Sequence, residues 1–195
     1  MSNDLPRAVR PAAPVPRRPS PAGRARPAFA LLAAAVLAAT APARADWLVD
    51  GDQFRVSYGP SAYHFSGSDG HVRFNHLLSG ELLSRRWTVW GADRSIVGFA
   101  AFDNSFGQFS QYAYVGQEWD LGRWAGGTWY VNATLGLLHG YKEPYEDKIP
   151  FNQYGIAPVI IPNLGWRYGR FAIVASVLGA NGFLFAASWN FDLRP

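Results

Sequence analysis

Apolar and polar residues alternate along several stretches of the chain. In residues 183–191, apolar side chains fill the odd positions, four of them aromatic, and small or polar side chains fill most even positions. Residues 128–138 repeat the pattern, with Trp, Val, Ala and Leu on one face and Thr, Tyr, Asn and Gly on the other. A period of two is typical of β-strands with one apolar face. It predicts strands at 54–65, 73–85, 95–103, 110–119, 128–139, 156–167, 170–178 and 183–191.

The number and length of these segments favour a membrane barrel. There are eight of them, and a length of about ten residues suits tilted transmembrane strands. A soluble β-sandwich would alternate in the same way, so that alternative stays open. We expect an all-β fold, an eight-stranded antiparallel transmembrane β-barrel of the outer-membrane type, closed because lipid cannot satisfy an open sheet edge. Its lumen would hold side chains and at most one small ligand, which excludes a wide pore.

The connections between the predicted strands sort onto two sides of the membrane. With the N-terminus on the periplasmic side, alternate connections face outward, and the longest of them is 140–155. The outward set is 66–72, 104–109, 140–155 and 179–182. The periplasmic set is 86–94, 120–127 and 168–169.

The first 45 residues differ in composition from the rest. They hold seven of the 18 basic side chains, one acidic side chain and eight of the 14 prolines. An apolar run at 28–40 follows, shorter than the roughly 20 residues that span a bilayer, and then the small-residue cleavage pattern Ala43-Arg44-Ala45. We expect a secretory signal peptide at 1–45 and the barrel at 46–195. The alternative is a disordered basic tail with one buried helix.

The net charge of +4 belongs to this N-terminal segment. Residues 46–195 carry 11 basic and 13 acidic side chains, so the basic pI does not indicate a nucleic-acid partner. The absence of cysteine excludes a disulfide scaffold, thiolate metal sites and a cysteine nucleophile. We expect no cofactor and no metal ion.

All four histidines fall near the outward ends of predicted strands, at positions 64, 71, 76 and 139. In Tyr63-His64-Phe65, alternation places the imidazole on the face opposite the aromatic side chains, toward the lumen. A histidine near a serine can act as a general base for acyl transfer, and a carboxylate would orient the ring. Ser105 could supply the hydroxyl and Asp103 the carboxylate. The alternative is that Asn-Ser-Phe-Gly is a turn and His64 a hydrogen-bonded rim residue.

Three short segments resemble the outer-membrane lipid A palmitoyltransferases. They are Tyr63-His64-Phe65, Phe102-Asp103-Asn104-Ser105-Phe106 and Ala157-Pro158-Val159-Ile160-Ile161-Pro162. Members of that family are eight-stranded barrels that move a palmitoyl chain from a phospholipid onto lipid A. The resemblance implies a catalytic site of His64, Asn104 and Ser105, with Asn104 standing where the family has Asp. It also implies that the two prolines interrupt a strand ladder and open a lateral gap for lipid; local bending is the alternative.

Two groups of charged residues need partners or water. Residues 139–150 are the most charged stretch after residue 45. Their acidic side chains could bind divalent cations that bridge lipopolysaccharide, and their lysines could bind its phosphates. The alternative is that the segment is a solvated loop. Glu81 shares a strand face with Asn75 and Ser79. If that face is the lumen, a partner such as Arg55 is expected, because an unpaired buried charge is costly.

We expect a monomeric barrel in the bacterial outer membrane, with phospholipid and lipid A as its partners. Three functional hypotheses remain for it. The first is a lipid A acyltransferase, or an acyl hydrolase with the same residues, which needs His64 and Ser105 to meet above a narrow apolar lumen. The second is a non-catalytic structural or adhesive barrel with polar pairs in the lumen and no such meeting. The third is a small-solute transporter, which needs a continuous polar path.

Overall fold

A computed structural model describes residues 48–65, 74–152, 154–180 and 182–194. The expected signal peptide and His71 lie outside the described residues. The described elements are β1 (Gln53–Gly59), β2 (Ala62–His64), β3 (Leu77–Ser84), β4 (Arg94–Asp103), β5 (Phe109–Trp124), β6 (Gly127–His139), the short 3-10 helix η1 (Glu146–Lys148), β7 (Ile156–Tyr168), β8 (Phe171–Val177) and β9 (Gly182–Asp192). In this part of the chain, no helix is long and apolar enough to cross a membrane.

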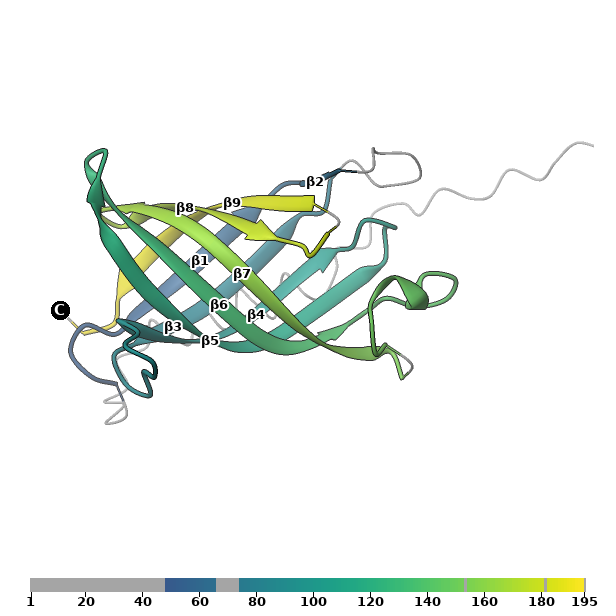
Figure 1. Ribbon diagram of the computed structural model, residues 1–195, viewed down its shortest axis with the longest axis horizontal. Helices are drawn as coiled ribbons and strands as arrows, with labels where there is room; N and C mark the ends of the chain where they lie inside the picture. Colours follow the sequence, from purple (N-terminus) through teal and green to yellow (C-terminus); the bar gives the residue numbers. More distant parts are fainter. Residues whose placement is uncertain (1–47, 66–73, 153, 181, 195) are drawn as a thin grey trace, which may run out of the picture.

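The sheet closes on itself through its first strand. β1 pairs with β3 on one edge and with β9 on the other, and β3 to β9 pair in sequence order, all antiparallel. β1 and β2 form two parts of the first barrel strand, so the nine elements make a closed eight-stranded antiparallel β-barrel (Figure 1). The prediction of an all-β, eight-stranded antiparallel barrel is therefore confirmed. We call the end with connections 104–108 and 140–155 the loop end, and the end with connections 85–93, 125–126 and 169–170 the turn end.

Two predicted boundaries were wrong. The strand predicted at 54–65 is interrupted at Pro60-Ser61. The connection predicted at 120–127 is mostly strand, because β5 continues to Trp124 after a register shift between Asp120 and Gly122. The turn itself is Ala125-Gly126, with φ of 52° and 79°, as a tight two-residue hairpin requires. A long β5–β6 hairpin thus projects beyond the barrel wall at the turn end (Figure 1).

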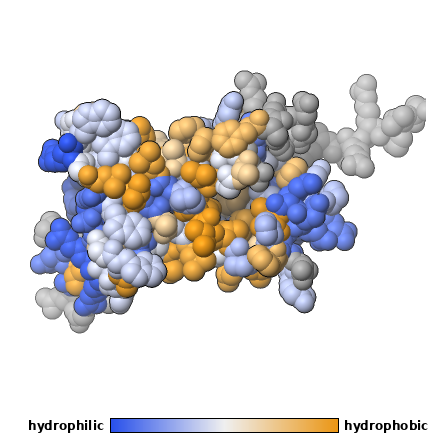
Figure 2. Space-filling model, viewed as in Figure 1, coloured by the Kyte–Doolittle hydropathy of each residue, from blue (hydrophilic) through white to orange (hydrophobic). Residues whose placement is uncertain are grey.

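The barrel is apolar outside and polar inside. Exposed outward side chains include Val97, Phe99, Val115, Leu135, Ile160, Ile173, Phe185 and Trp189. Buried lumen side chains include Arg55, Ser57, Ser79, Glu118, Asn132, Thr134, Ser188 and Asn190. Figure 2 shows the apolar surface as a band across the middle of the molecule, with hydrophilic residues at both ends. The strand faces predicted for 128–138 and 183–191 are both observed.

Tyrosine rings fill the lumen where a neighbouring strand carries glycine. The pairs are Tyr112 with Gly136, Tyr114 with Gly98 and Tyr130 with Gly165. A Cβ atom at each glycine would overlap the ring of its tyrosine. Because these tyrosines are less than one tenth exposed, the rings have little room to move away. Small residues beside large ones therefore let a narrow barrel close over bulky side chains.

This packing predicts the effect of Gly165→Ala. Overpacking against the ring of Tyr130 should lower the free energy of unfolding by about 1–3 kcal/mol. Urea unfolding of the refolded barrel, followed by tryptophan fluorescence, measures the loss. In a Tyr130→Leu chain, the same glycine substitution should cost less, because the overlapping ring is gone. Strictly additive effects of the two changes would contradict the contact.

An ion network crosses the lumen near the turn end. Glu118 is fully buried and accepts bonds from Arg55 (2.8 Å), Arg94 (2.9 Å) and Arg167 (2.8 Å). Arg55 also reaches Glu81 at 3.3 Å, so the partner predicted for Glu81 is confirmed. The carboxylates and guanidinium groups come from five different strands, and the network ties opposite walls of the barrel together.

Tyr130 lies between two members of this network. The guanidinium carbons of Arg55 and Arg167 stand 5.2 and 5.1 Å from the centre of its ring, within the range of cation–π attraction. Tyr130 and Glu118 are both 0% exposed. Water therefore does not reach these side chains, and the lumen is filled at this level.

The strand ladder is interrupted twice toward the loop end. β7 pairs with β8 only from Asn163 to Tyr168, so the segment 156–162, which contains both prolines, has no ladder partner on β8 among the described residues. The ladder between β1 and β3 ends at Gly59 and Leu77, and β2 pairs with β9 alone. β2, β9 and β8 therefore form a three-stranded flap, which separates from the rest of the wall at the loop end (Figure 1).

Candidate functional site

The side chains of His64 and Ser105 meet at the loop end. His64 is the last residue of β2 in the flap, and Ser105 lies in the connection between β4 and β5. Ser105 Oγ lies 2.8 Å from His64 Nε2, which is hydrogen-bonding distance. Ser105 is 8% exposed and His64 is half-buried. The contact bridges the interruption between the flap and the remaining wall.

Ser105 sits at the start of a tight turn that Asn104 holds. Asn104 is 1% exposed, and its Oδ1 accepts the backbone N–H groups of Phe106 and Gln108, both at 3.0 Å. The N–H of Gly107 donates to the Asn104 carbonyl at 2.9 Å, and Gly107 takes the positive φ of 76° that favours glycine. Asn-Ser-Phe-Gly is thus a turn, and this same turn presents the serine hydroxyl to the histidine.

Asn75 joins the two elements that carry the pair. Its Oδ1 accepts the N–H of Ala62 in β2 at 2.9 Å, and its Nδ2 donates to the carbonyl of Asp103 in β4 at 2.9 Å. Ala62 precedes His64 by two residues, and Asp103 precedes Ser105 by two. Asn75 is 3% exposed, so its amide stands in for the missing ladder at the interruption.

The long connection between β6 and β7 packs on the serine turn. The rings of Phe106 and Tyr145 stack with centroids 4.0 Å apart, and Tyr141 meets Phe106 edge-on. The side chain of Gln108 bonds the backbone of Lys142 in both directions, at 3.0 and 3.1 Å. Tyr141 also covers the apolar residues at the lumen mouth, and this burial raises its pKa to about 12. The serine turn therefore rests on a packed support.

The other predicted residues lie elsewhere. His76 is exposed, and its Nδ1 lies 2.9 Å from the hydroxyl of Tyr58. His139 is exposed at the end of β6. Lys148 pairs with its neighbour Asp147, at 3.5 Å and in an exposed position, which fits a solvated loop. Among the described residues, no group of three or more His, Asp or Glu side chains could hold a metal ion.

The geometry is that of a serine whose hydroxyl can lose its proton to a neighbouring imidazole. A Ser–His hydrogen bond is the elementary unit of nucleophilic acyl transfer. No protein-family model and no curated protein matches this chain.

Sequence reasoning missed the supporting residues of this site. Alternation places Asn75 on the face of Glu81 but does not indicate that its amide joins two strands, and nothing in the sequence pattern links Gln108 or Tyr145 to the serine. Their roles depend on where β2 parts from β3 and on how one loop folds over another. Pro60 was the available signal for the first, because a proline inside a strand marks an interrupted ladder.

Proposed function

We propose that this protein is an outer-membrane barrel that transfers or hydrolyses lipid acyl chains through His64 and Ser105. The observation that carries the proposal is the 2.8 Å contact between Ser105 Oγ and His64 Nε2. The apolar band around the barrel supports a membrane location, since transmembrane barrels expose apolar side chains to lipid. The loop end would face outward, at the depth of the lipid headgroups and their ester bonds.

The contact suggests the following steps. Ser105 Oγ attacks an ester carbonyl of a phospholipid while His64 Nε2 takes the hydroxyl proton. The bond from the carbonyl carbon to the glycerol oxygen breaks, and His64 returns the proton to the departing lysophospholipid. A lipid A hydroxyl, or water in the hydrolytic case, then attacks the acyl-serine, with its proton passing through His64 to Ser105. Alternatively, His64 takes the proton of the lipid A hydroxyl directly, and Ser105 polarises the scissile carbonyl.

The interrupted ladders support access from the side. Pro158 and Pro162 cannot donate to a neighbouring strand, and they lie in the segment of β7 that β8 leaves unpaired. On the lumen side, the hydroxyls of Tyr112 and Thr134 donate to the carbonyls of Val159 and Ile161, both at 3.3 Å. An acyl chain entering between β7 and β8 would reach the lumen below the serine turn.

Mass spectrometry of lipid A tests the proposal. Lipid A from outer-membrane-containing cells that express the protein should carry one more acyl chain than lipid A of cells that lack it, if the protein transfers acyl chains. In the hydrolytic case lipid A stays the same, and lysophospholipid and free fatty acid accumulate. If lipid A and phospholipid were unchanged while the protein was correctly folded in the membrane, the enzymatic function would be excluded. The remaining hypothesis would be a non-catalytic structural barrel, which the polar pairs in the lumen favour. The filled lumen at Glu118 and Tyr130 counts against a transporter.

Asn104→Asp should keep activity or raise it. Aspartate retains the oxygen that accepts the N–H groups of Phe106 and Gln108, and its charge strengthens both bonds. It also restores the carboxylate of the family that the sequence resembles. Initial rates of acyl release from a labelled phospholipid measure the effect. A folded variant slower by tenfold or more would contradict it, and if neither wild type nor variant is active, the enzymatic function should be abandoned.

The proposed orientation predicts where a protease cuts intact cells. Trypsin should cleave first in the connection between β6 and β7, at Lys142 or Lys148, because both side chains are exposed at the loop end. The exposed Arg123 and Arg170 at the turn end should be cut only after the outer membrane is opened. The reverse order would place the loop end in the periplasm.

A further inference from the structure

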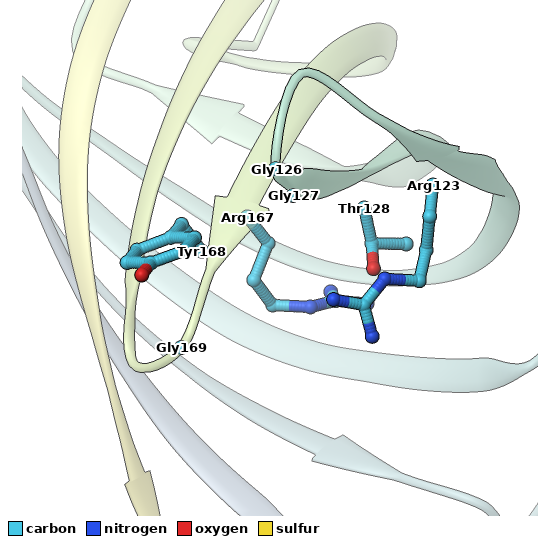
Figure 3. A pocket seen from close by; sticks show the side chains of 7 residues that line it. All are labelled: Arg123, Gly126, Gly127, Thr128, Arg167, Tyr168 and Gly169. Carbon is cyan, nitrogen blue, oxygen red and sulfur yellow. The ribbon is translucent and has the colours of Figure 1, made fainter.

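A polar groove opens at the turn end, at the opposite end of the barrel from His64 and Ser105. It has a volume of about 180 Å³ and lies between the β5–β6 hairpin and the β7–β8 turn. Its lining residues are Arg123, Gly126, Gly127, Thr128, Arg167, Tyr168 and Gly169. Figure 3 shows Arg123 and Arg167 extending toward each other from opposite sides of the groove, with the Thr128 hydroxyl pointing toward their guanidinium groups.

The two arginines differ in how their charges are balanced. Arg167 bonds Glu118 and Asp120, both at 2.8 Å. The side chain of Arg123 makes no ion pair or hydrogen bond within the described part of the chain. Asp93 also lies near the hairpin, but its side chain accepts the backbone N–H of Asp120 and does not line the groove. The groove therefore holds one cation without a counter-charge beside a second cation, and such a pair attracts an anion.

The donors in the groove match an oxoanion. Guanidinium groups bind phosphate and carboxylate with paired N–H donors, and two guanidinium groups can bind different oxygens of one anion. Thr128 adds a hydroxyl. The glycines at the two turns bring backbone close to the ligand without side chains in the way, as in other anion-binding loops.

We propose that this groove binds a phosphate group. In the orientation given above, the turn end lies at the headgroups of the periplasmic leaflet, where phosphodiesters are the abundant anions. Tyr168 and Trp166, whose rings stack beside the groove, suit the same interfacial level. Free phosphate presents the same oxygens, so the test compares the two sources. Binding here does not require acyl transfer at the loop end.

Backbone NMR of the full refolded barrel in a phosphate-free maltoside detergent tests the site. Inorganic phosphate is added to one sample and short-chain phosphatidylglycerol to another, while the amides of Gly127, Thr128 and Gly169 are followed. We expect saturable shifts of these amides in at least one sample. Saturation with the lipid alone assigns a headgroup site, and saturation with inorganic phosphate assigns a phosphate site open to the free ion.

Matched variants separate this groove from general charge attraction. Arg123→Gln should weaken binding about tenfold or more, since it removes the charge and the charge-assisted hydrogen bonds that the guanidinium group would donate to the anion. Arg85→Gln removes the same charge from an exposed position at the same end and should leave binding unchanged. Thr128→Val gives a second variant should Arg123→Gln fail to refold. The absence of saturable shifts in both samples, or equal weakening by Arg85→Gln and Arg123→Gln, would overturn the proposal.

Discussion

Glu118→Ala is expected to destabilise the barrel by about 3–5 kcal/mol, the cost of leaving buried charges without their partner. Three guanidinium groups converge on this carboxylate, from Arg55, Arg94 and Arg167. Without it, Arg55 keeps Glu81 and the Asn190 side chain. Arg94 and Arg167 keep the partly exposed Asp120. The three cations nevertheless lose the buried carboxylate that lies between them, and they repel one another. Urea unfolding from lipid vesicles at constant ionic strength measures the change.

Two further variants serve as controls for this measurement. Glu118→Gln preserves the volume and removes the charge, so a loss close to that of Glu118→Ala assigns the effect to charge and not to a cavity. Asp147→Ala removes a carboxylate from an exposed ion pair, which should cost no more than about 1 kcal/mol. If Glu118→Ala were as mild as Asp147→Ala, the network would not hold the barrel walls together.

His64→Ala and Ser105→Ala should each lower the rate of acyl transfer or release by about 10²–10⁴, the usual contribution of a general base and its partner. Both variants should fold, because the residues lie at the rim and not in the Glu118 network. Rates with a labelled phospholipid in mixed micelles give the comparison, and the gel mobility of heated and unheated protein confirms folding.

The double variant and a second histidine provide the controls. If the two groups act as one unit, the His64→Ala, Ser105→Ala chain should be no slower than either single variant. His76→Ala removes an exposed histidine that contacts Tyr58 on the outer face, and it should keep the wild-type rate. Equal losses from His76→Ala and His64→Ala would indicate a general disturbance of the loop end and contradict the proposed roles.

The barrel was predictable because its main determinant is local. In residues 183–191, the polarity of each side chain indicates the sheet face on which it lies, and burial alternates in the same way in β9. The pairing of Glu81 with Arg55 could also be inferred, since both lie in adjacent strands on the lumen side. Arg94 and Arg167 could not be assigned to Glu118, because that requires the shape of the closed barrel.

The candidate site was predictable in part. Topology places the ends of the strands that carry His64 and Ser105 at the same end of the barrel, and the structure places the two side chains in contact. The side-chain oxygen of Asn104 accepts N–H groups of the turn backbone, and its amide donates to the Gln108 side chain. None of these contacts involves the Ser105 hydroxyl. Turn geometry decides where that amide points, and alternation along a strand carries no information about it.

The seam between β1 and β9 has a consequence for assembly. Gln53 lies opposite Asp192, so the first and last strands complete each other. Until β9 is in place, β1 and β8 each carry a row of backbone groups that hydrocarbon cannot hydrogen-bond. In the proposed membrane location, insertion one strand at a time would leave these edges without hydrogen-bond partners in the bilayer, so the chain would have to enter as a nearly complete sheet. Such a contact, between residues far apart in sequence, also forms late and makes folding slow.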